Sequence, residues 1–299
     1  MTAFSAGDRP LRGIAFVVLG FACFGVTDAL SKAGLETMST AQMLAIRSVV
    51  VLLLMLPWIH RAGGLAVLRT SRPRDHAIRV LCSLVSMVCF FEALRHLELA
   101  TAIALGFVAP LIMTALSVPM LGERVGIHRW SAIVVGFAGA LVIVRPGPDG
   151  VQPAALLCLF AAATWAASMV YARRLSRSDP EITMILFQNL AVALVMGAAA
   201  PLMWRPVGVF ELGLIALMAC AILVGQWCTF RGFRLAPVGL VAPFQYSELL
   251  WATMFGWLIW REFPDPPVWI GTAILIASGL YVIWRERVRA RETAGSGSG

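Results

Sequence analysis

The segment 89–130, CFFEALRHLELATAIALGFVAPLIMTALSVPMLGERVGIHRW, reappears without a gap as segment 228–269, CTFRGFRLAPVGLVAPFQYSELLWATMFGWLIWREFPDPPVW. Identical residues recur at an offset of 139 residues, and two of the identical pairs are charged, which is rare in this chain. Self-similarity at a fixed offset indicates a duplicated unit. The coincident pairs include Cys89/Cys228, Phe91/Phe230, Arg95/Arg234, Thr114/Thr253, Glu123/Glu262 and Trp130/Trp269.

Composition places both units in a lipid bilayer. A chain of 299 residues that is 60% hydrophobic and 13% charged has more apolar surface than a soluble domain can bury. The net charge of +8 does not indicate nucleic acid, because the basic residues are scattered between apolar runs. The six cysteines lie in apolar segments without the spacing of a metal site, so we expect no metal and no cofactor.

Hydropathy, interrupted by Pro, Gly and charged residues, predicts an all-α membrane protein with ten transmembrane helices. Five spans per unit is an odd number, so the second unit enters the bilayer upside down, and the two units form inverted-topology repeats. We assign 1–150 to the first repeat, 151–290 to the second, and 291–299 to a disordered tail that ends as an appended linker. The predicted spans are 11–33, 40–58, 77–96, 99–121, 127–145, 152–173, 181–203, 211–232, 239–260 and 267–285.

The distribution of basic residues predicts the orientation. With the N-terminus inside, 18 Lys and Arg residues fall on the inner side, five fall outside, and Arg47 lies within a span. The positive-inside rule therefore places both termini on the cytoplasmic side of the membrane. We expect this membrane to be the bacterial inner membrane. Loops are short except for 59–76, which leaves no room for a soluble catalytic domain, and no intramembrane His or HExxH motif is present. We expect no enzyme activity and no catalytic residues.

The five-span unit, with Gly122-Glu123 after its fourth helix and Arg261-Glu262 at the same place in the second copy, resembles the EamA-type unit of the drug/metabolite transporter superfamily. The fragment from Pro110 to Glu123 is similar to that family's fourth-helix signature. The second copy departs from it, because Leu249 occupies the place of Pro110 and its proline comes earlier, at Pro243. The resemblance implies transport, and among ten-span bacterial members it favours broad-specificity exporters of aromatic and neutral amino acids, the YddG type.

Two charged residues lie at similar depth in the first two spans. Asp28 and Arg47 are both roughly 10 Å from the outer end of their helices at 1.5 Å per residue. Their counterparts in the second repeat, Met169 and Gln188, are uncharged. We predict an ion pair, which is either a structural strut, the interpretation we favour, or a coupling site in which Asp28 carries a proton or receives a substrate ammonium group.

The most hydrophilic stretch inside any predicted span is Gln245 to Glu248. Glu248 is the deepest charge, and Pro243 leaves a backbone carbonyl without its helical partner two residues before this stretch. Interrupted helices near the bilayer midplane often form transporter sites. We therefore assign Gln245, Tyr246 and Glu248 to a substrate site, with hydrogen bonding between helices as the alternative.

The repeat also selects aromatic candidates. Phe107 corresponds to Tyr246, and Phe24 corresponds to Trp165, all in the middle of their spans. Two such pairs around a two-fold axis would line a cavity suited to ring-bearing or cationic cargo. Packing against lipid or other helices is the alternative. Gln226, in the eighth span, is a further candidate for the site.

We predict a secondary transporter that exports small metabolites, foremost neutral and aromatic amino acids, by alternating access. A nucleotide conjugate or a cationic drug is the alternative cargo. A lipid-binding or scaffold membrane protein that transports nothing is the alternative class. The expected partners are a small-molecule substrate and the lipid bilayer. The direction of transport, the coupling ion and the oligomeric state remain open.

Overall fold

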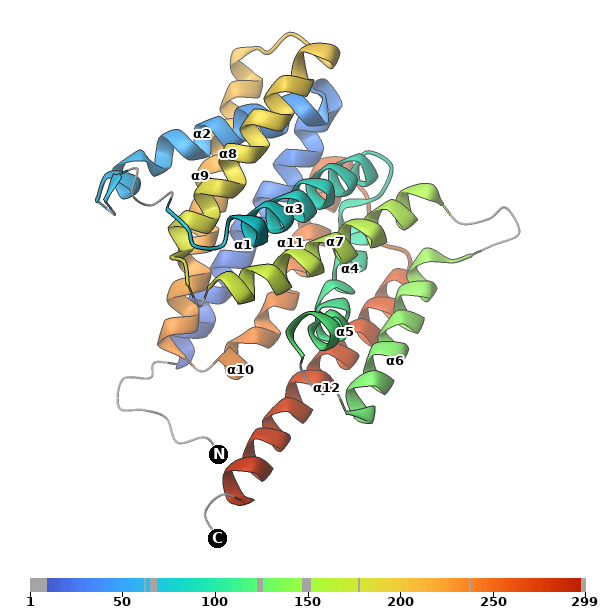
Figure 1. Cartoon of the computed structure of the whole chain (residues 1–299). Helices are drawn as coiled ribbons and strands as arrows, with labels where there is room; N and C mark the ends of the chain where they lie inside the picture. The colour runs from blue at the N-terminus through green and yellow to red at the C-terminus, as the bar shows by residue number, and fades with distance from the viewer. Residues whose placement is uncertain are drawn as a thin grey trace.

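The computed structural model describes residues 10–61, 63–64, 69–122, 126–146, 152–176, 178–236 and 238–296, and over these residues it is helical throughout, with short connecting loops (Figure 1). The helices are α1 (Pro10–Thr37), α2 (Thr40–Arg61), α3 (Pro73–Leu94), α4 (Leu99–Gly106), α5 (Ala109–Leu121), α6 (Ile127–Val144), α7 (Pro153–Leu175), α8 (Glu181–Ala199), η2 (Ala200–Met203), α9 (Val209–Leu235), α10 (Val238–Val241), η3 (Ala242–Tyr246), α11 (Ser247–Trp260) and α12 (Pro266–Ser296).

Within the described residues, nine segments are long and apolar enough to cross a membrane. The tenth predicted span, 239–260, is divided among α10, η3 and α11, and its longest piece has 14 residues. Pro243 lies inside η3, where its missing N–H prevents a regular α-helix. The chain is therefore an all-α, multi-pass membrane protein, and the interrupted segment is its tenth span.

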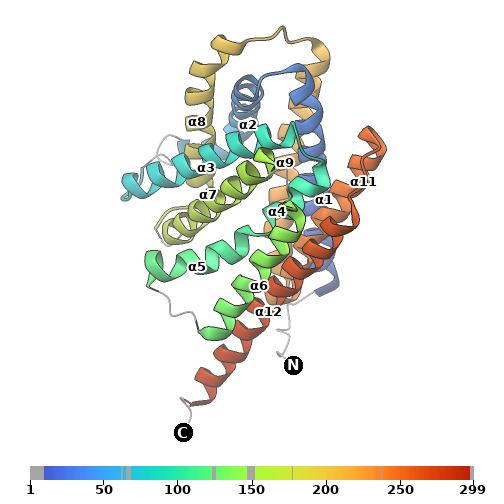
Figure 2. The same ribbon diagram turned by 90° about the vertical axis from the view of Figure 1, so that its right-hand side faces the viewer.

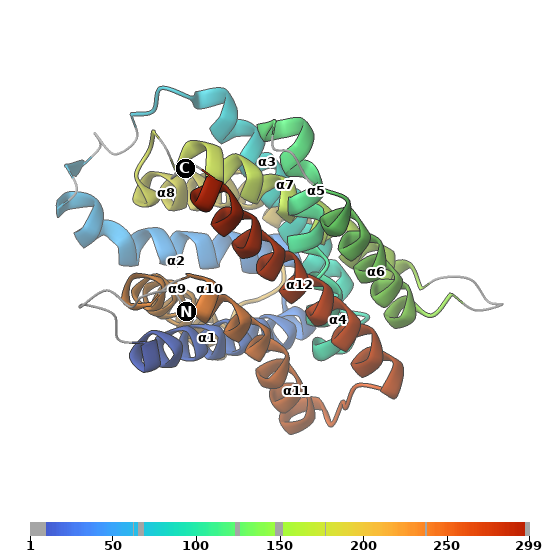
Figure 3. The ribbon, with the colours of Figure 1, turned by 90° about the horizontal axis from the view of Figure 1, so that it is seen from below.

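The helices pair between repeats, as inverted topology requires. α1 packs along α9, α3 along α7, α2 along α8, and α6 along α12, so every pair takes one helix from each repeat (Figure 3). Exchange of the repeats converts the α1 and α9 pair into the α7 and α3 pair, and returns the other two pairs to themselves. This two-fold arrangement confirms the predicted inverted repeats.

Glycines allow the paired helices to approach closely. A Cβ added to Gly271 of α12 would lie 2.4 Å from the carbonyl oxygen of Gly139 on α6. A Cβ added to Gly232 of α9 would lie 2.8 Å from the carbonyl oxygen of Gly13 on α1. Inside lipid the hydrophobic effect does not drive helices together, so the close packing that small residues permit stabilises such crossings.

The start of α1 and the end of α12 lie on the same side of the bundle, the lower side in Figure 2. We call this side the terminal end and the opposite side the far end. α12 continues to Ser296, so 291–296, which we expected to be disordered, are helical in the structure, and 297–299 lie outside the described residues. Arg, Glu and Ala between 285 and 294 favour continuation of the last helix.

The centre of the bundle is built from the two interrupted spans. The 99–120 segment, which contains α4 and nearly all of α5, is the most buried of the nine spans. In its apolar stretch of 18 residues, 56% of the residues are buried. α4 of the first interrupted span packs against α11 of the second, and α1 and α7 flank this pair. The two-fold axis therefore passes between two helices that are both broken near mid-depth.

Candidate functional site

The breaks in the two central spans are equivalent. Phe107 separates α4 from α5 with φ −66° and ψ −5°, and Tyr246 precedes α11 with φ −66° and ψ −9°. A proline accompanies each break: Pro110 at the start of α5 and Pro243 within η3. Although these prolines occupy different positions of the repeat, each removes a backbone donor from its span. Both spans therefore break at the same repeat position.

The side chains at the two breaks meet at the centre of the molecule. The rings of Phe107 and Tyr246 have centroids 5.0 Å apart and planes at 89°, an edge-to-face contact, and each residue is 8% exposed. The Tyr246 hydroxyl lies against Gly279 of α12, where an added Cβ would be 2.2 Å away. Neither aromatic faces lipid, so the alternative of lipid contact does not hold for this pair.

Two carboxylates flank the crossing of α1 and α11 near mid-depth. Gly25 and Trp251 mark the crossing of these helices, because a Cβ added to Gly25 would lie 2.8 Å from the Trp251 Cβ. Asp28 lies three residues after this crossing, toward the far end, and Glu248 lies three residues before it, toward the terminal end, and their charges interact. Both are partly exposed, and within the described residues neither carboxylate has a hydrogen-bond partner. Two carboxylates near mid-depth are thus free to bind a ligand.

Arg47 lies near this carboxylate pair without bonding to it. Arg47 is 5% exposed, its charge interacts with that of Asp28, and its guanidinium carbon lies 5.7 Å from the centroid of the Phe91 ring. Among the described residues no ion pair within 4.0 Å joins Arg47 to Asp28, and the Arg47 Nε is buried without a partner. The direct ion pair that we predicted is absent among the described residues, and the Arg47 guanidinium lies over the Phe91 ring of α3.

The repeat counterpart of Arg47 lies against the same helix. Gln188 donates from Nε2 to the Met87 sulfur at 3.7 Å, and its Oε1 is buried without a partner. Met87 and Phe91 are one turn apart on α3, so Arg47 and Gln188 approach one face of that helix. A buried unpartnered donor and a buried unpartnered acceptor therefore lie along one face of α3, and the charge of Arg47 interacts with that of Asp28.

The other predicted site residues are more dispersed. Phe24 packs against Gly225 of α9, where an added Cβ would be 2.8 Å from its ring. Gln226 and Gln245 are partly buried, and within the described residues neither side chain makes a hydrogen bond. Trp165 is 43% exposed and makes no ring contact with a described residue. Of the predicted set, the structure brings together Phe107 with Tyr246, and Asp28 with Glu248 and Arg47.

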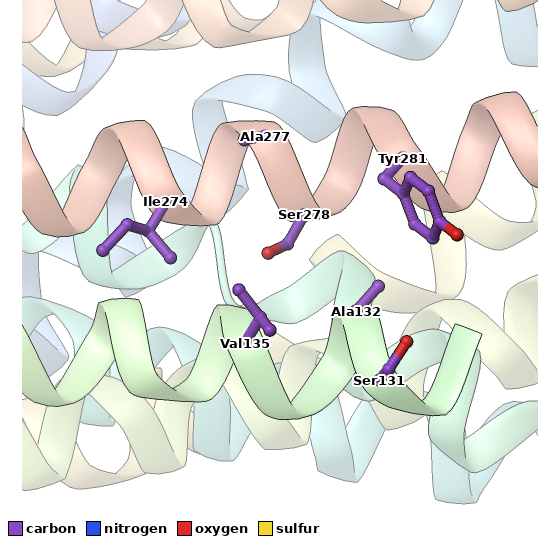
Figure 4. A pocket seen from close by; sticks show the side chains of 7 residues that line it. All are labelled: Ser131, Ala132, Val135, Ile274, Ala277, Ser278 and Tyr281. Atoms are coloured by element: carbon purple, nitrogen blue, oxygen red, sulfur yellow. The ribbon is translucent and has the colours of Figure 1, made fainter. Parts of the chain in front are cut away.

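A groove of about 320 Å³ opens elsewhere, between α6 and α12 (Figure 4). Its lining is mainly apolar, with Val135 facing Ile274, and it includes the hydroxyl of Ser278, which is buried without a partner. None of the predicted site residues lines it, and Val135 is 52% exposed at its rim. This groove is separate from the central charges.

An ion pair that the sequence did not indicate joins the repeats at the far end. Lys32 of α1 bonds to Glu262, just after α11, and donates to the Leu97 carbonyl at 3.1 Å. Its ammonium also lies 4.9 Å from the centroid of the Trp260 ring. Arg261 adopts φ 58°, a left-handed C-cap that turns Glu262 toward α1. The repeat equivalent of this glutamate, Glu123, lies outside the described residues.

A second buried contact joins the repeats at the terminal end. The His76 Nε2 lies 2.6 Å from the Asp179 Oδ2, and the Thr70 hydroxyl donates to the same oxygen at 2.6 Å. Burial alone would raise the pKa of Asp179, but the hydrogen bonds from Thr70 and His76 outweigh it and hold the pKa below its usual value. Nothing in the sequence pairs His76 of α3 with the loop before α8, 103 residues away.

This shift predicts an acid-sensitive contact. A carboxyl with a lowered pKa stabilises the folded chain above its unfolded pKa, about 3.9, and that stabilisation is lost as the pH falls through the folded pKa. We expect Asp179→Asn to lower the free energy of unfolding at pH 6 by about 2 kcal/mol, because His76 loses a charged partner. Its stability should then depend less than that of the wild type on pH between 3 and 5, in unfolding titrations in mixed micelles. Parallel pH profiles would refute this assignment.

Ten spans in two inverted repeats, with charged side chains at mid-depth between interrupted helices, define a membrane transporter. The chain belongs to the EamA-like transporter family, whose model matches residues 11–145 and 152–285, and thus to the drug/metabolite transporter superfamily. These two matches correspond to the two structural repeats.

Curated relatives cover nearly the whole chain. It is 26% identical over 296 residues to the riboflavin transporter of Vibrio cholerae, covering 96% of this chain and 98% of the relative. It is 26% identical to the S-adenosylmethionine uptake transporter of Rickettsia prowazekii, covering 93% and 94%. It is 30% identical to the pseudopaline exporter CntI of Pseudomonas aeruginosa, covering 92% and 95%. A solved crystal structure shares the fold, with a TM-score of 0.59 at 22% identity over 91% of this chain and 95% of the other.

Proposed function

We propose that this protein is a secondary transporter of small zwitterionic metabolites, foremost amino acids with apolar or aromatic side chains, and that the cargo binds between the two interrupted spans. The observation that carries this proposal is the group of Asp28, Glu248 and Arg47, three charged side chains near mid-depth without a direct ion pair. Ionisable groups inside a membrane are costly and mark substrate or ion pathways.

The charges suit both ends of an amino acid. The carboxylates of Asp28 and Glu248 can accept hydrogen bonds from an ammonium group, and the Arg47 guanidinium can donate to a carboxylate. When both carboxylates are ionised, two anions and one cation leave an excess negative charge, which a cargo ammonium or a proton can neutralise. Phe107 and Tyr246 supply an aromatic surface for an apolar side chain. Phe24, Gln226 and Gln245 are proposed as further contacts, and Trp165 as a contact made only after the helices move.

A second candidate cargo is an uncharged ring compound. The aromatic pair at the centre would stack on a flat ring, and relatives of this chain are named as riboflavin transporters. A neutral ring, however, leaves the charges of Asp28, Glu248 and Arg47 without partners. The charged group therefore favours the zwitterionic cargo.

We place the protein in the bacterial inner membrane with the terminal end in the cytoplasm, because the Lys and Arg residues are concentrated on that side. Export is the proposed direction. Either coupling to protons or facilitated diffusion is compatible with two carboxylates at mid-depth.

The test is a cargo panel in proteoliposomes, with and without an imposed proton gradient. Amino acids, riboflavin and S-adenosylmethionine are each measured by counterflow, and liposomes without protein provide the background. We expect saturable flux of amino acids that carry apolar or aromatic side chains. Flux of riboflavin alone would overturn the cargo assignment. If the protein is folded but transports no compound of the panel, the result would favour a lipid-binding or scaffold role.

A further inference from the structure

The ion pair at the far end lies on the same stripe of α1 as the central carboxylate. Lys32 follows Asp28 by four residues, and residues four apart on a helix are neighbours, with Cβ atoms about 5–6 Å apart. The Lys32 ammonium bonds to Glu262 and to the Leu97 carbonyl at the far end. Lysine carries its charge on a flexible four-carbon stem, so one ammonium can reach either carboxylate.

The Lys32 contacts close the far end across several elements. One ammonium joins α1 to the end of α11 through Glu262, and to the loop between α3 and α4 through the Leu97 carbonyl. The Trp260 indole nitrogen donates to the Glu36 carboxylate of α1 at 2.7 Å, so α1 and α11 are joined a second time. Lys32 is 8% exposed, so little water competes with Glu262 for its ammonium group.

A nearby ion pair at the same end provides a comparison. Arg145 and Asp265 lie 3.1 Å apart, but their side chains are 44% and 64% exposed. An exposed pair of this kind contributes little to stability. It joins α6 to the loop before α12, and neither of its residues belongs to α1. Its removal therefore tests the loss of a far-end ion pair without touching the path to the centre.

We propose that Lys32 is a gating residue whose ammonium exchanges between Glu262, when the far end is closed, and Asp28, when the far end is open. Binding of a cationic group to Asp28 removes the alternative partner and holds Lys32 on Glu262. When that group leaves, Asp28 again competes with Glu262 for the Lys32 ammonium, and the contacts at the far end weaken. The Asp28 part of this mechanism extends the proposed function, whereas the closing contact itself does not depend on the cargo.

Hydrogen–deuterium exchange of the protein in lipid nanodiscs, without cargo, tests the gate. Lys32→Gln and Glu262→Gln should speed exchange of backbone amides in 94–102 and 256–263 by on the order of tenfold. Amides in 73–80 and 178–184, at the terminal end, should be unchanged. The charge exchange Lys32→Glu with Glu262→Lys should restore slow exchange, and Asp265→Asn should have no effect. Equal acceleration at both ends, or the same effect from Asp265→Asn, would overturn the gate.

The exchange of partners has a separate readout. Asp28→Asn removes the competing carboxylate, so far-end amides should exchange more slowly than in the wild type, by on the order of threefold. In the Lys32→Gln background the same substitution should change nothing, because no ammonium remains to be shared. A purely structural role for Lys32 predicts no such dependence. Unchanged far-end exchange in Asp28→Asn would refute the Asp28 step, and because no cargo is present, it would leave the transport assignment intact.

Discussion

Replacement of Asp28 by asparagine is expected to reduce transport of ammonium-bearing cargo by roughly 30- to 100-fold. The substitution keeps the shape of the side chain and removes its charge. A hydrogen bond to a charged group contributes about 2–3 kcal/mol, and each 1.4 kcal/mol corresponds to a factor of ten in affinity. Counterflow in proteoliposomes, with the best cargo of the amino-acid panel, measures this loss.

The control is Asp265→Asn, which removes an exposed carboxylate from the far end. It should transport at the wild-type rate. Glu248→Gln should also reduce flux, because the charges of Glu248 and Asp28 interact on adjacent helices. Wild-type flux in Asp28→Asn would exclude Asp28 from the binding site.

The same two variants test proton coupling. If Asp28 or Glu248 carries a coupled proton, an imposed gradient should accelerate flux in the wild type and lose its effect in the corresponding neutral variant. Flux that ignores the gradient in all three proteins would indicate facilitated diffusion. This comparison is independent of cargo affinity, because each protein is compared with itself at two gradients.

The internal repeat predicted much of the fold. An offset of 139 residues aligned Phe107 with Tyr246, and these residues occupy matching breaks and touch each other. This follows from the two-fold relation, since residues near the axis lie close to their own counterparts. Hydropathy predicted ten spans because each backbone polar group in lipid must be satisfied within a helix. The interruption at Pro243 followed from the missing N–H.

Which neighbouring helix each helix face contacts could not be predicted in the same way. Equal depth suggested that Asp28 and Arg47 bond, but Arg47 lies over Phe91 of α3. Sequence spacing fixes which residues share a face of one helix, not which neighbouring helix that face meets. The Lys32 to Glu262 contact spans 230 residues of sequence, and no local pattern indicates it. Two features of the sequence still single out these residues. Lys32 lies four residues after Asp28, on the same face of α1, and Glu262 coincides with Glu123 in the repeat.

Substitution of the first repeat with residues of the second should show whether Asp28 and Arg47 depend on each other. Asp28→Met and Arg47→Gln introduce the residues found at 169 and 188. Each single change leaves the other charge inside the bundle with less compensation, so each should lower the free energy of unfolding by about 3 kcal/mol. The double variant should lose less than the sum, by on the order of 1–2 kcal/mol, because charges several Å apart still interact in a medium of low dielectric constant.

Denaturant titration in mixed micelles, followed by circular dichroism, measures this coupling energy. The control cycle is Arg145→Gln with Asp265→Asn, a pair 3.1 Å apart but exposed, whose coupling should stay below about 0.5 kcal/mol. Stronger coupling between Asp28 and Arg47, which are not in direct contact, would mean that the low-dielectric interior contributes more than proximity does. A coupling near zero would mean that Phe91 alone stabilises Arg47, and that the two charges are kept for the cargo and not for each other.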